Sequence, residues 1–122
     1  MECTTMTGLG EVVQSLAARD GVEGVLLLSA DGLPIERSRE GTFESETVAA
    51  LAATLARHAD PLGQGSGRGE LRTAVLEYSG GLAVLARVGG GDWLAILTEH
   101  GADVGPLLYD LRHHRPALTA LL

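Results

Sequence analysis

Residues 48–59 read Val-Ala-Ala-Leu-Ala-Ala-Thr-Leu-Ala-Arg-His-Ala, and this stretch decides how the chain folds. Alanine and leucine are strong helix formers, and we predict a helix from Phe43 to Leu62. One apolar stripe of this helix follows the i, i+3, i+4, i+7 spacing of a side that faces its own core. Its members are Val48, Leu51, Ala52, Leu55, Ala59 and Leu62.

A second, thinner stripe of the same helix consists of Ala49, Ala53 and Ala56. These residues lie roughly 100° around the helix from the first stripe. Their small side chains allow another backbone to approach closely. We therefore expect the helix to contact its own sheet with the first stripe and a second polypeptide with the alanines. This pattern predicts a protein that works by association and not by catalysis.

The length of 122 residues corresponds to one domain. Hydrophobic residues make up 45% of the chain, which is enough for a core, and aromatic residues only 3%, so the core must be aliphatic. We expect residues 1–7 to form a flexible N-terminal tail and residues 8–122 to form the domain.

The charge and the apolar runs exclude several functions. The net charge of -7 argues against nucleic-acid binding, which needs clustered cations to neutralise phosphates. The apolar runs are much shorter than the roughly 20 residues of a membrane-spanning helix, and no secretory signal is recognisable at the start. The single cysteine, Cys3, fits a reducing compartment. We therefore expect a cytoplasmic protein without membrane insertion.

Apolar periodicity and turn residues predict three helices and five strands. A helix with apolar residues from Leu9 to Ala17 precedes the first two strands, and another helix starts near Asp103. The connections between the last three strands are too short for anything but antiparallel pairing, and Ala30-Asp31-Gly32 between the first two is a hairpin signal. The predicted strands are Val22–Ser29, Leu33–Arg39, Leu71–Tyr78, Leu82–Val88 and Asp92–Thr98. The fold class is thus α+β, with a five-stranded antiparallel sheet, one helix on one face and two on the other.

The strand from Leu71 to Tyr78 is predicted to lie at an edge of the sheet, because it follows the glycine-rich stretch 63–69 and begins a three-strand meander. Its apolar residues make it a poorly protected edge, and exposed apolar edges aggregate unless they are paired. Pairing with the same strand of a second copy would solve this problem.

The residues that could carry chemistry do not form a recognisable site. The glycines of residues 63–69 follow a helix and precede a strand, whereas a phosphate-binding loop has the opposite order. Adjacent His113 and His114 point about 100° apart on a helix, and with His58 and His100 they lack further ligands at suitable spacing. We expect no catalytic residues, no cofactor and no metal, and hence no enzyme.

Four stretches resemble the Roadblock/dynein light chain family, in particular its bacterial GTPase-partner branch. They are Gly24–Pro34, the helix Val48–Ala59, and the glycine-linked turns at Gly80-Gly81 and Gly89–Asp92. The resemblance covers about residues 8–115. It implies a profilin-like or longin-like sandwich that forms a homodimer, with antiparallel middle helices and with the third strands paired edge to edge. It also implies a small Ras-like GTPase as partner, docked on the paired middle helices.

The residues and the resemblance together give two expected surfaces. The dimer interface is expected at Ala49, Ala53, Ala56, Leu71, Thr73 and Val75. The GTPase-facing surface is expected at Glu46, Ala50 and Arg57, on the outer side of the helix.

The expected function is that of a homodimeric adaptor or regulator that tunes the activity or localisation of a Ras-like GTPase. One alternative is a purely structural dimerisation module of a larger signalling or motility complex. Another is a small-molecule sensor, which the scarcity of Phe and Trp disfavours.

Overall fold

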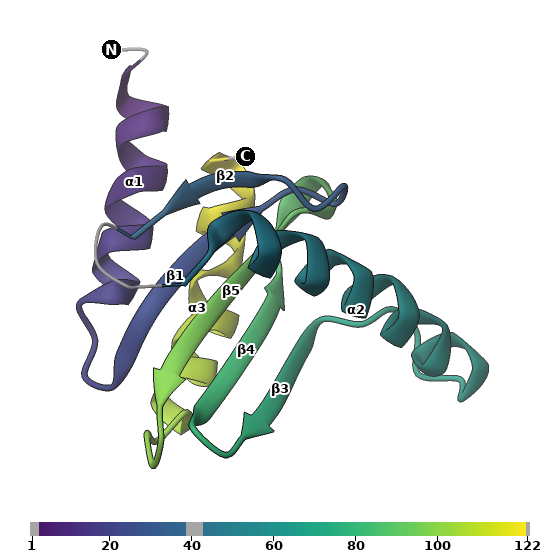
Figure 1. Cartoon of the computed structure of the whole chain (residues 1–122). Helices are drawn as coiled ribbons and strands as arrows, with labels where there is room; N and C mark the ends of the chain where they lie inside the picture. The colour runs from purple at the N-terminus through teal and green to yellow at the C-terminus, as the bar shows by residue number, and fades with distance from the viewer. Residues whose placement is uncertain (1–2, 39–42, 122) are drawn as a thin grey trace.

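The computed structural model describes the backbone of residues 3–38 and 43–121 and the side chains of residues 10–38 and 43–113. The order of helices and strands is the predicted one (Figure 1). The elements are α1 (Cys3–Ala17), β1 (Val22–Leu28), β2 (Pro34–Arg37), α2 (Ser45–Gly65), β3 (Thr73–Tyr78), β4 (Gly81–Arg87), the short 3-10 turn η1 (Gly89–Gly91), β5 (Trp93–Glu99) and α3 (Gly105–Leu121).

The five strands form one antiparallel sheet in the order β2-β1-β5-β4-β3. The first and last strands of the sequence, β1 and β5, pair in its centre through six residue pairs. The strand β3 forms one edge of the sheet, as predicted, and the short strand β2 forms the other. The central strands β1 and β5 are buried on both faces of the sheet, which explains their nearly continuous apolar sequence.

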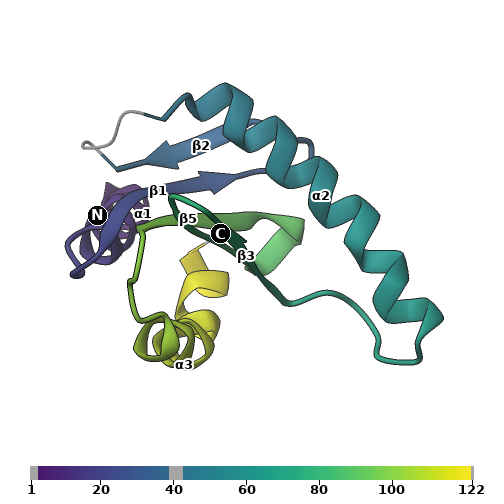
Figure 2. The same ribbon diagram turned by 60° about the horizontal axis from the view of Figure 1, so that its bottom comes forward.

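Helices cover both faces of the sheet, as Figure 2 shows, with α2 on one side and α3 on the other. One core cluster joins α1 and α3 to the sheet through Val13, Leu107 and Leu111, which pack on residues such as Val25 and Ile96. The second cluster joins α2 to the opposite face. The predicted distribution of one helix on one face and two on the other is confirmed.

The turn between β1 and β2 brings this hairpin close to α2. Gly32 has a φ of 88°, and its N–H donates to the Ser29 carbonyl at 2.9 Å. A Cβ atom at this position would lie 3.2 Å from the Cα of Ala50 in α2. Glycine therefore provides the left-handed conformation of the turn and also the space for the helix above it.

Two predicted boundaries differ from the structure. The helix α1 begins at Cys3, within the segment 1–7 that we expected to be a tail. The helix α2 continues to Gly65, beyond the predicted end at Leu62 and through Pro61. Proline lacks the N–H that bonds to the fourth preceding carbonyl, but the surrounding turns keep their helical geometry. Figure 2 shows that this last part of α2 extends beyond the edge of the sheet.

Candidate interaction surface

The alanine stripe of α2 faces the sheet of its own chain, which corrects our prediction for the dimer interface. Ala49, Ala53 and Ala56 are buried, with 0%, 2% and 4% of their surface exposed. By contrast, Leu51 is 64% exposed and Leu62 is 75% exposed. The alanine stripe therefore faces the sheet and cannot reach a second polypeptide. Of the stripe that we expected to face the core, Ala52 is buried and Val48 and Leu55 pack against the same core, whereas Leu51 and Leu62 face outward.

The physical reason is the size of the side chains that the sheet presents to α2. Leu26, Leu28, Leu85 and Trp93 point toward the helix and supply most of the volume of this core layer. Interiors pack to a nearly constant density, so large residues on one element require small ones on the element opposite. Because both stripes of α2 are apolar, helical periodicity could not decide between them.

A largely apolar groove runs between α2 and the sheet, next to β3. Its volume is about 370 Å³. The helix contributes Val48, Leu51 and Leu55, and β3 contributes Leu76 and Tyr78. The remaining lining residues are Ala52, Ala83, Leu85, Ala95 and Leu97. We call this feature the apolar groove; it leaves part of the inner face of α2 and of the sheet accessible from one side.

The outer edge of β3 continues this apolar surface. Strand β3 has a neighbouring strand, β4, on one side only. Val75 is 44% exposed and Tyr78 is 59% exposed, while Leu71 and Thr73 are half-buried. Leu71, Thr73 and Val75, three of the residues expected at a dimer interface, thus lie at or beside an edge with apolar character. Their role in dimerisation remains a prediction.

A group of polar contacts fixes the start of β3 to α2. The Asp60 carboxylate accepts hydrogen bonds from the Leu71 N–H at 2.7 Å and from Arg87 at 3.3 Å. The Nε of Arg87 also donates to the Leu71 carbonyl at 2.7 Å. The guanidinium of Arg87 lies 4.7 Å from the centre of the Trp93 ring, within cation–π distance. Trp93 itself is buried in the core.

The three residues expected to face a GTPase are exposed on α2. Glu46, Ala50 and Arg57 lie on the side of the helix away from the apolar groove, and none of them lines it. The Thr54 hydroxyl donates to the Ala50 carbonyl at 2.8 Å and accepts a hydrogen bond from Arg57 at 3.2 Å. This side of α2 is polar and accessible, as a docking surface requires.

Three arginines line an open pocket of about 880 Å³ below the last part of α2. Arg68 and Arg72 come from the connection between α2 and β3, and Arg112 comes from α3. Glu70 is the acidic residue in the lining. Sequence reasoning missed this arrangement, because only the tertiary fold brings Arg112 to residues some forty positions earlier.

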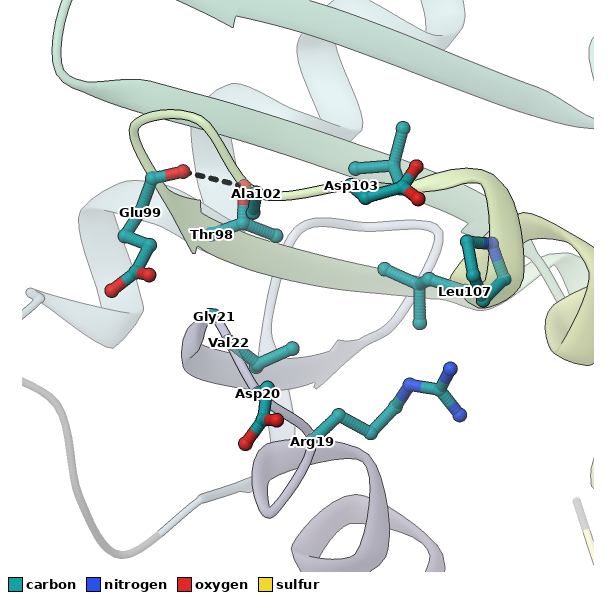
Figure 3. A pocket seen from close by; sticks show the side chains of 11 residues that line it. Arg19, Asp20, Gly21, Val22, Thr98, Glu99, Ala102, Asp103 and Leu107 are labelled. Atoms are coloured by element: carbon teal, nitrogen blue, oxygen red, sulfur yellow. Dashed lines mark hydrogen bonds between the residues drawn. The ribbon is translucent and has the colours of Figure 1, made fainter.

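A further cavity of about 480 Å³ lies between the end of α1 and the start of α3 (Figure 3). Two of its charged residues have structural partners. Arg19 forms an ion pair with Asp110, and the Asp103 carboxylate accepts a hydrogen bond from the Gly105 N–H at 3.1 Å, at the start of α3. These contacts stabilise the loops around the cavity, and they do not resemble a catalytic arrangement.

The ionisable groups give one resolved perturbation. Burial raises the pKa of the Asp92 carboxyl, and a hydrogen bond from the Ala30 backbone opposes this shift. Within the described residues there is no group of three or more His, Cys, Asp and Glu that could hold a metal ion. The side chain of His114 lies outside the described part. No helix in the described residues has the length and apolarity to span a bilayer.

The fold and its surfaces define a small α+β domain with an exposed apolar helix side and an open strand edge, features of an association module. The chain belongs to the Roadblock/LC7 domain family, whose model matches residues 8–98. No curated protein matches the sequence significantly.

Solved structures agree with this family. A Roadblock/LC7 domain from Streptomyces avermitilis is 27% identical, with 89% of this chain and 96% of that chain covered and a TM-score of 0.76. MglB from Myxococcus xanthus is 17% identical, with 94% of each chain covered and a TM-score of 0.84. The gliding protein MglB from Thermus thermophilus is 18% identical, with 91% of this chain and 85% of that chain covered and a TM-score of 0.78.

Proposed function

We propose that this protein is a homodimeric regulator or adaptor of a small Ras-like GTPase. The observation that carries the proposal is the apolar groove beside the open edge of β3. A single chain leaves Leu51 and Tyr78 extensively exposed in the lining of this groove, and Leu62 on α2 and Val75 on the edge strand are exposed as well. Exposed apolar surface of this kind marks interaction sites in soluble proteins.

A second copy is the occupant that suits this side best. Most homo-oligomers are two-fold dimers with self-complementary interfaces. A two-fold axis perpendicular to the sheet at β3 would pair the two β3 strands antiparallel and would also reverse the direction of α2. The helices would then pack side by side through the Leu51, Leu55 and Leu62 side chains. Such an arrangement covers the groove and removes the exposed strand edge at the same time.

Dimerisation is tested by light scattering at several dilutions. We expect twice the chain mass of 12.7 kDa at micromolar concentration. A monomer at every concentration would contradict the dimer. It would also contradict a GTPase-binding surface that is formed by the α2 helices of two copies.

The polar side of α2 is the proposed surface for the GTPase. Glu46, Ala50 and Arg57 are exposed there, and a dimer with adjacent α2 helices would present two copies of this side together. The family resemblance supplies the class of partner, and the accessible side of the helix supports the location. We expect one GTPase per dimer, because a partner that lies across the axis blocks a second one.

The decisive experiment titrates a Ras-like GTPase encoded beside this protein, loaded with GDP or with a GTP analogue, against the dimer. A regulator must bind the two nucleotide states with different affinity, because only a differential contact shifts a two-state equilibrium. Equal affinity for both states would support the alternative, a purely structural dimerisation module.

The location is tested with the double variant Glu46→Arg/Arg57→Glu, which inverts both charges and keeps their sum. We expect it to weaken binding at least tenfold. Glu11→Arg, exposed on α1 on the opposite side of the sheet, is the control and should bind normally. Equal affinity of the double variant and the wild type would place the GTPase on another surface.

A further inference from the structure

We propose that the two copies pair through β3 in one particular register, with Val75 of one copy directly opposite Val75 of the other on the two-fold axis. This inference rests on the proposed homodimer and specifies its interface at the level of residues. Three observations support it: the direction of the peptide groups of β3, the contacts of the residues that flank the strand, and the side chains that would face each other.

The hydrogen bonds between β3 and β4 determine which peptide groups point to the open edge. The Arg87 N–H donates to the Arg72 carbonyl at 2.8 Å, so residues 72 and 87 form a hydrogen-bonded pair. In an antiparallel ladder such pairs alternate with pairs that are not hydrogen-bonded. The peptide groups of the even-numbered residues of β3 therefore point toward β4. Those of Thr73, Val75 and Glu77 point toward the open edge.

Two-fold symmetry allows only a few registers. Around an axis perpendicular to the sheet, each residue must face a residue whose side chain lies on the same face of the sheet. Because side chains alternate between the faces, the axis must lie midway between one residue and its own copy, so that this residue faces itself across the two strands. Near the middle of β3 the choices are Ala74, Val75 and Leu76.

The flanking residues favour Val75. With the axis at Val75, the peptide groups of Thr73, Val75 and Glu77 face only one another, within the strand. With the axis at Ala74, Glu77 would face Leu71, whose N–H and carbonyl already bond to Asp60 and Arg87. With the axis at Leu76, Thr73 would face Ser79, which lies in the turn after β3.

The side chains on the face of α1 and α3 also favour this register. Val75 pairs with Val84 of β4, which belongs to the core on that face, so Val75 points to the same side. It is 44% exposed in the single chain. Two valines that face each other across the axis would bury this apolar surface. An axis at Leu76 would instead set the Glu77 carboxylate opposite Val75.

The side chains on the face of α2 are complementary in the same register. Arg72 would lie opposite Tyr78, which is 59% exposed, and Ala74 would lie opposite Leu76. An arginine over an exposed tyrosine ring gains cation–π attraction, and a small residue opposite a large one fills the space between the strands. Each of these pairs occurs twice in the dimer because of the symmetry.

Single cysteines report the register directly. The variants Ala74→Cys, Val75→Cys and Leu76→Cys are made in a Cys3→Ser background, so that each chain holds one thiol. Facing residues of a hydrogen-bonded antiparallel pair have Cα atoms about 5.5 Å apart, within the range of about 4.4–6.8 Å that a disulfide requires. Positions 74 and 76 would be offset from their own copies by two residues, which is about 7 Å along the strand.

We expect mild oxidation to convert Val75→Cys into a covalent dimer on a non-reducing gel at least tenfold faster than either neighbour. A mixture of Ala74→Cys and Leu76→Cys should form a mixed disulfide, because these two positions face each other in the proposed register. Denaturation in urea before oxidation should remove the difference between the three variants.

The outcomes test the register and the existence of the dimer separately. Faster cross-linking of Ala74→Cys or Leu76→Cys than of Val75→Cys would overturn the register. Slow cross-linking of all three, in a protein that light scattering shows to be dimeric, would place the interface elsewhere. A monomeric wild-type protein would overturn both the dimer and the register.

Discussion

The Asp60 carboxylate of α2 accepts a hydrogen bond from the backbone N–H of Leu71 at 2.7 Å. This contact connects the part of α2 that extends beyond the sheet with the chain just before β3. Arg87 completes it by bonding to both Asp60 and the Leu71 carbonyl. The position of the edge strand, and hence of the proposed interface, therefore depends on a carboxylate eleven residues earlier.

Replacement of Asp60 by alanine should destabilise the protein and weaken the dimer. The change leaves the Leu71 N–H without its acceptor and removes one of the two acceptors of the Arg87 guanidinium, and a hydrogen bond to a charged group contributes about 1.5–3 kcal/mol. Because Asp60 is partly exposed, we expect a loss at the lower end of this range in urea denaturation. The control Asp60→Asn keeps an acceptor oxygen for Leu71 and should lose less. Equal losses for the two variants would assign the effect to the charge alone.

A glutamate in the alanine stripe of α2 should prevent folding, whereas a glutamate at the exposed Leu51 should weaken only the dimer. Ala53→Glu places a carboxylate in a fully packed core layer, and we expect it to prevent stable folding, with a loss of more than about 3 kcal/mol. Leu51→Glu changes an exposed side chain and should preserve the circular dichroism and melting of the monomer while it weakens the dimer. Light scattering and thermal melting measure both effects. A folded Ala53→Glu protein with a weakened dimer would restore our prediction from the sequence.

Alanine at Gly81 should be destabilising, whereas alanine at Gly80 should not. Gly81 has a φ of 153°, and a Cβ atom there would lie 2.1 Å from the Thr98 carbonyl oxygen. The pairing of β4 with β5 would have to open at this point, at a cost of about 2 kcal/mol or more. The space around Gly80 is open, which makes it a matched control in the same turn. Similar melting temperatures for the two variants would show that the strand end adapts.

Neutralisation of Asp92 should stabilise the protein slightly near pH 7. Burial raises the pKa of this carboxyl in the folded state above its unfolded value. The folded state therefore binds the proton more tightly, and the favourable contribution of Asp92 is present at low pH and is lost as pH rises through its folded pKa. Asp92→Asn removes this loss and can keep the hydrogen bond from the Ala30 backbone.

We expect Asp92→Asn to raise the melting temperature slightly at pH 7. At pH 3, where Asp92 is protonated in both states, the two proteins should melt at nearly the same temperature. A variant that is less stable at pH 7 would show that the hydrogen bond from Ala30 requires the charged carboxylate.

Local sequence determined the elements and their connections. Turn residues such as Gly32 and the triple glycine of residues 89–91 lie where the predicted turns are, because these conformations depend on a few neighbouring residues. The short connections required antiparallel pairing, and the number of apolar positions required cover on both faces of the sheet. These features were sufficient to predict the fold class and the position of β3 at an edge of the sheet.

Only the tertiary structure decided which side of α2 faces the sheet. The Ala53 and Leu51 stripes are both apolar, so periodicity allows either one to face inward. The choice depends on the volume of Trp93 and of three leucines on the sheet, which leaves room for the methyl groups of the alanines directly beneath the helix, while Leu51 stays exposed. Only the tertiary structure also places Arg112 and Arg72 in the lining of one pocket. A contact between two distant segments depends on the shape and volume of the side chains of both segments. The sequence of one segment alone therefore does not predict it.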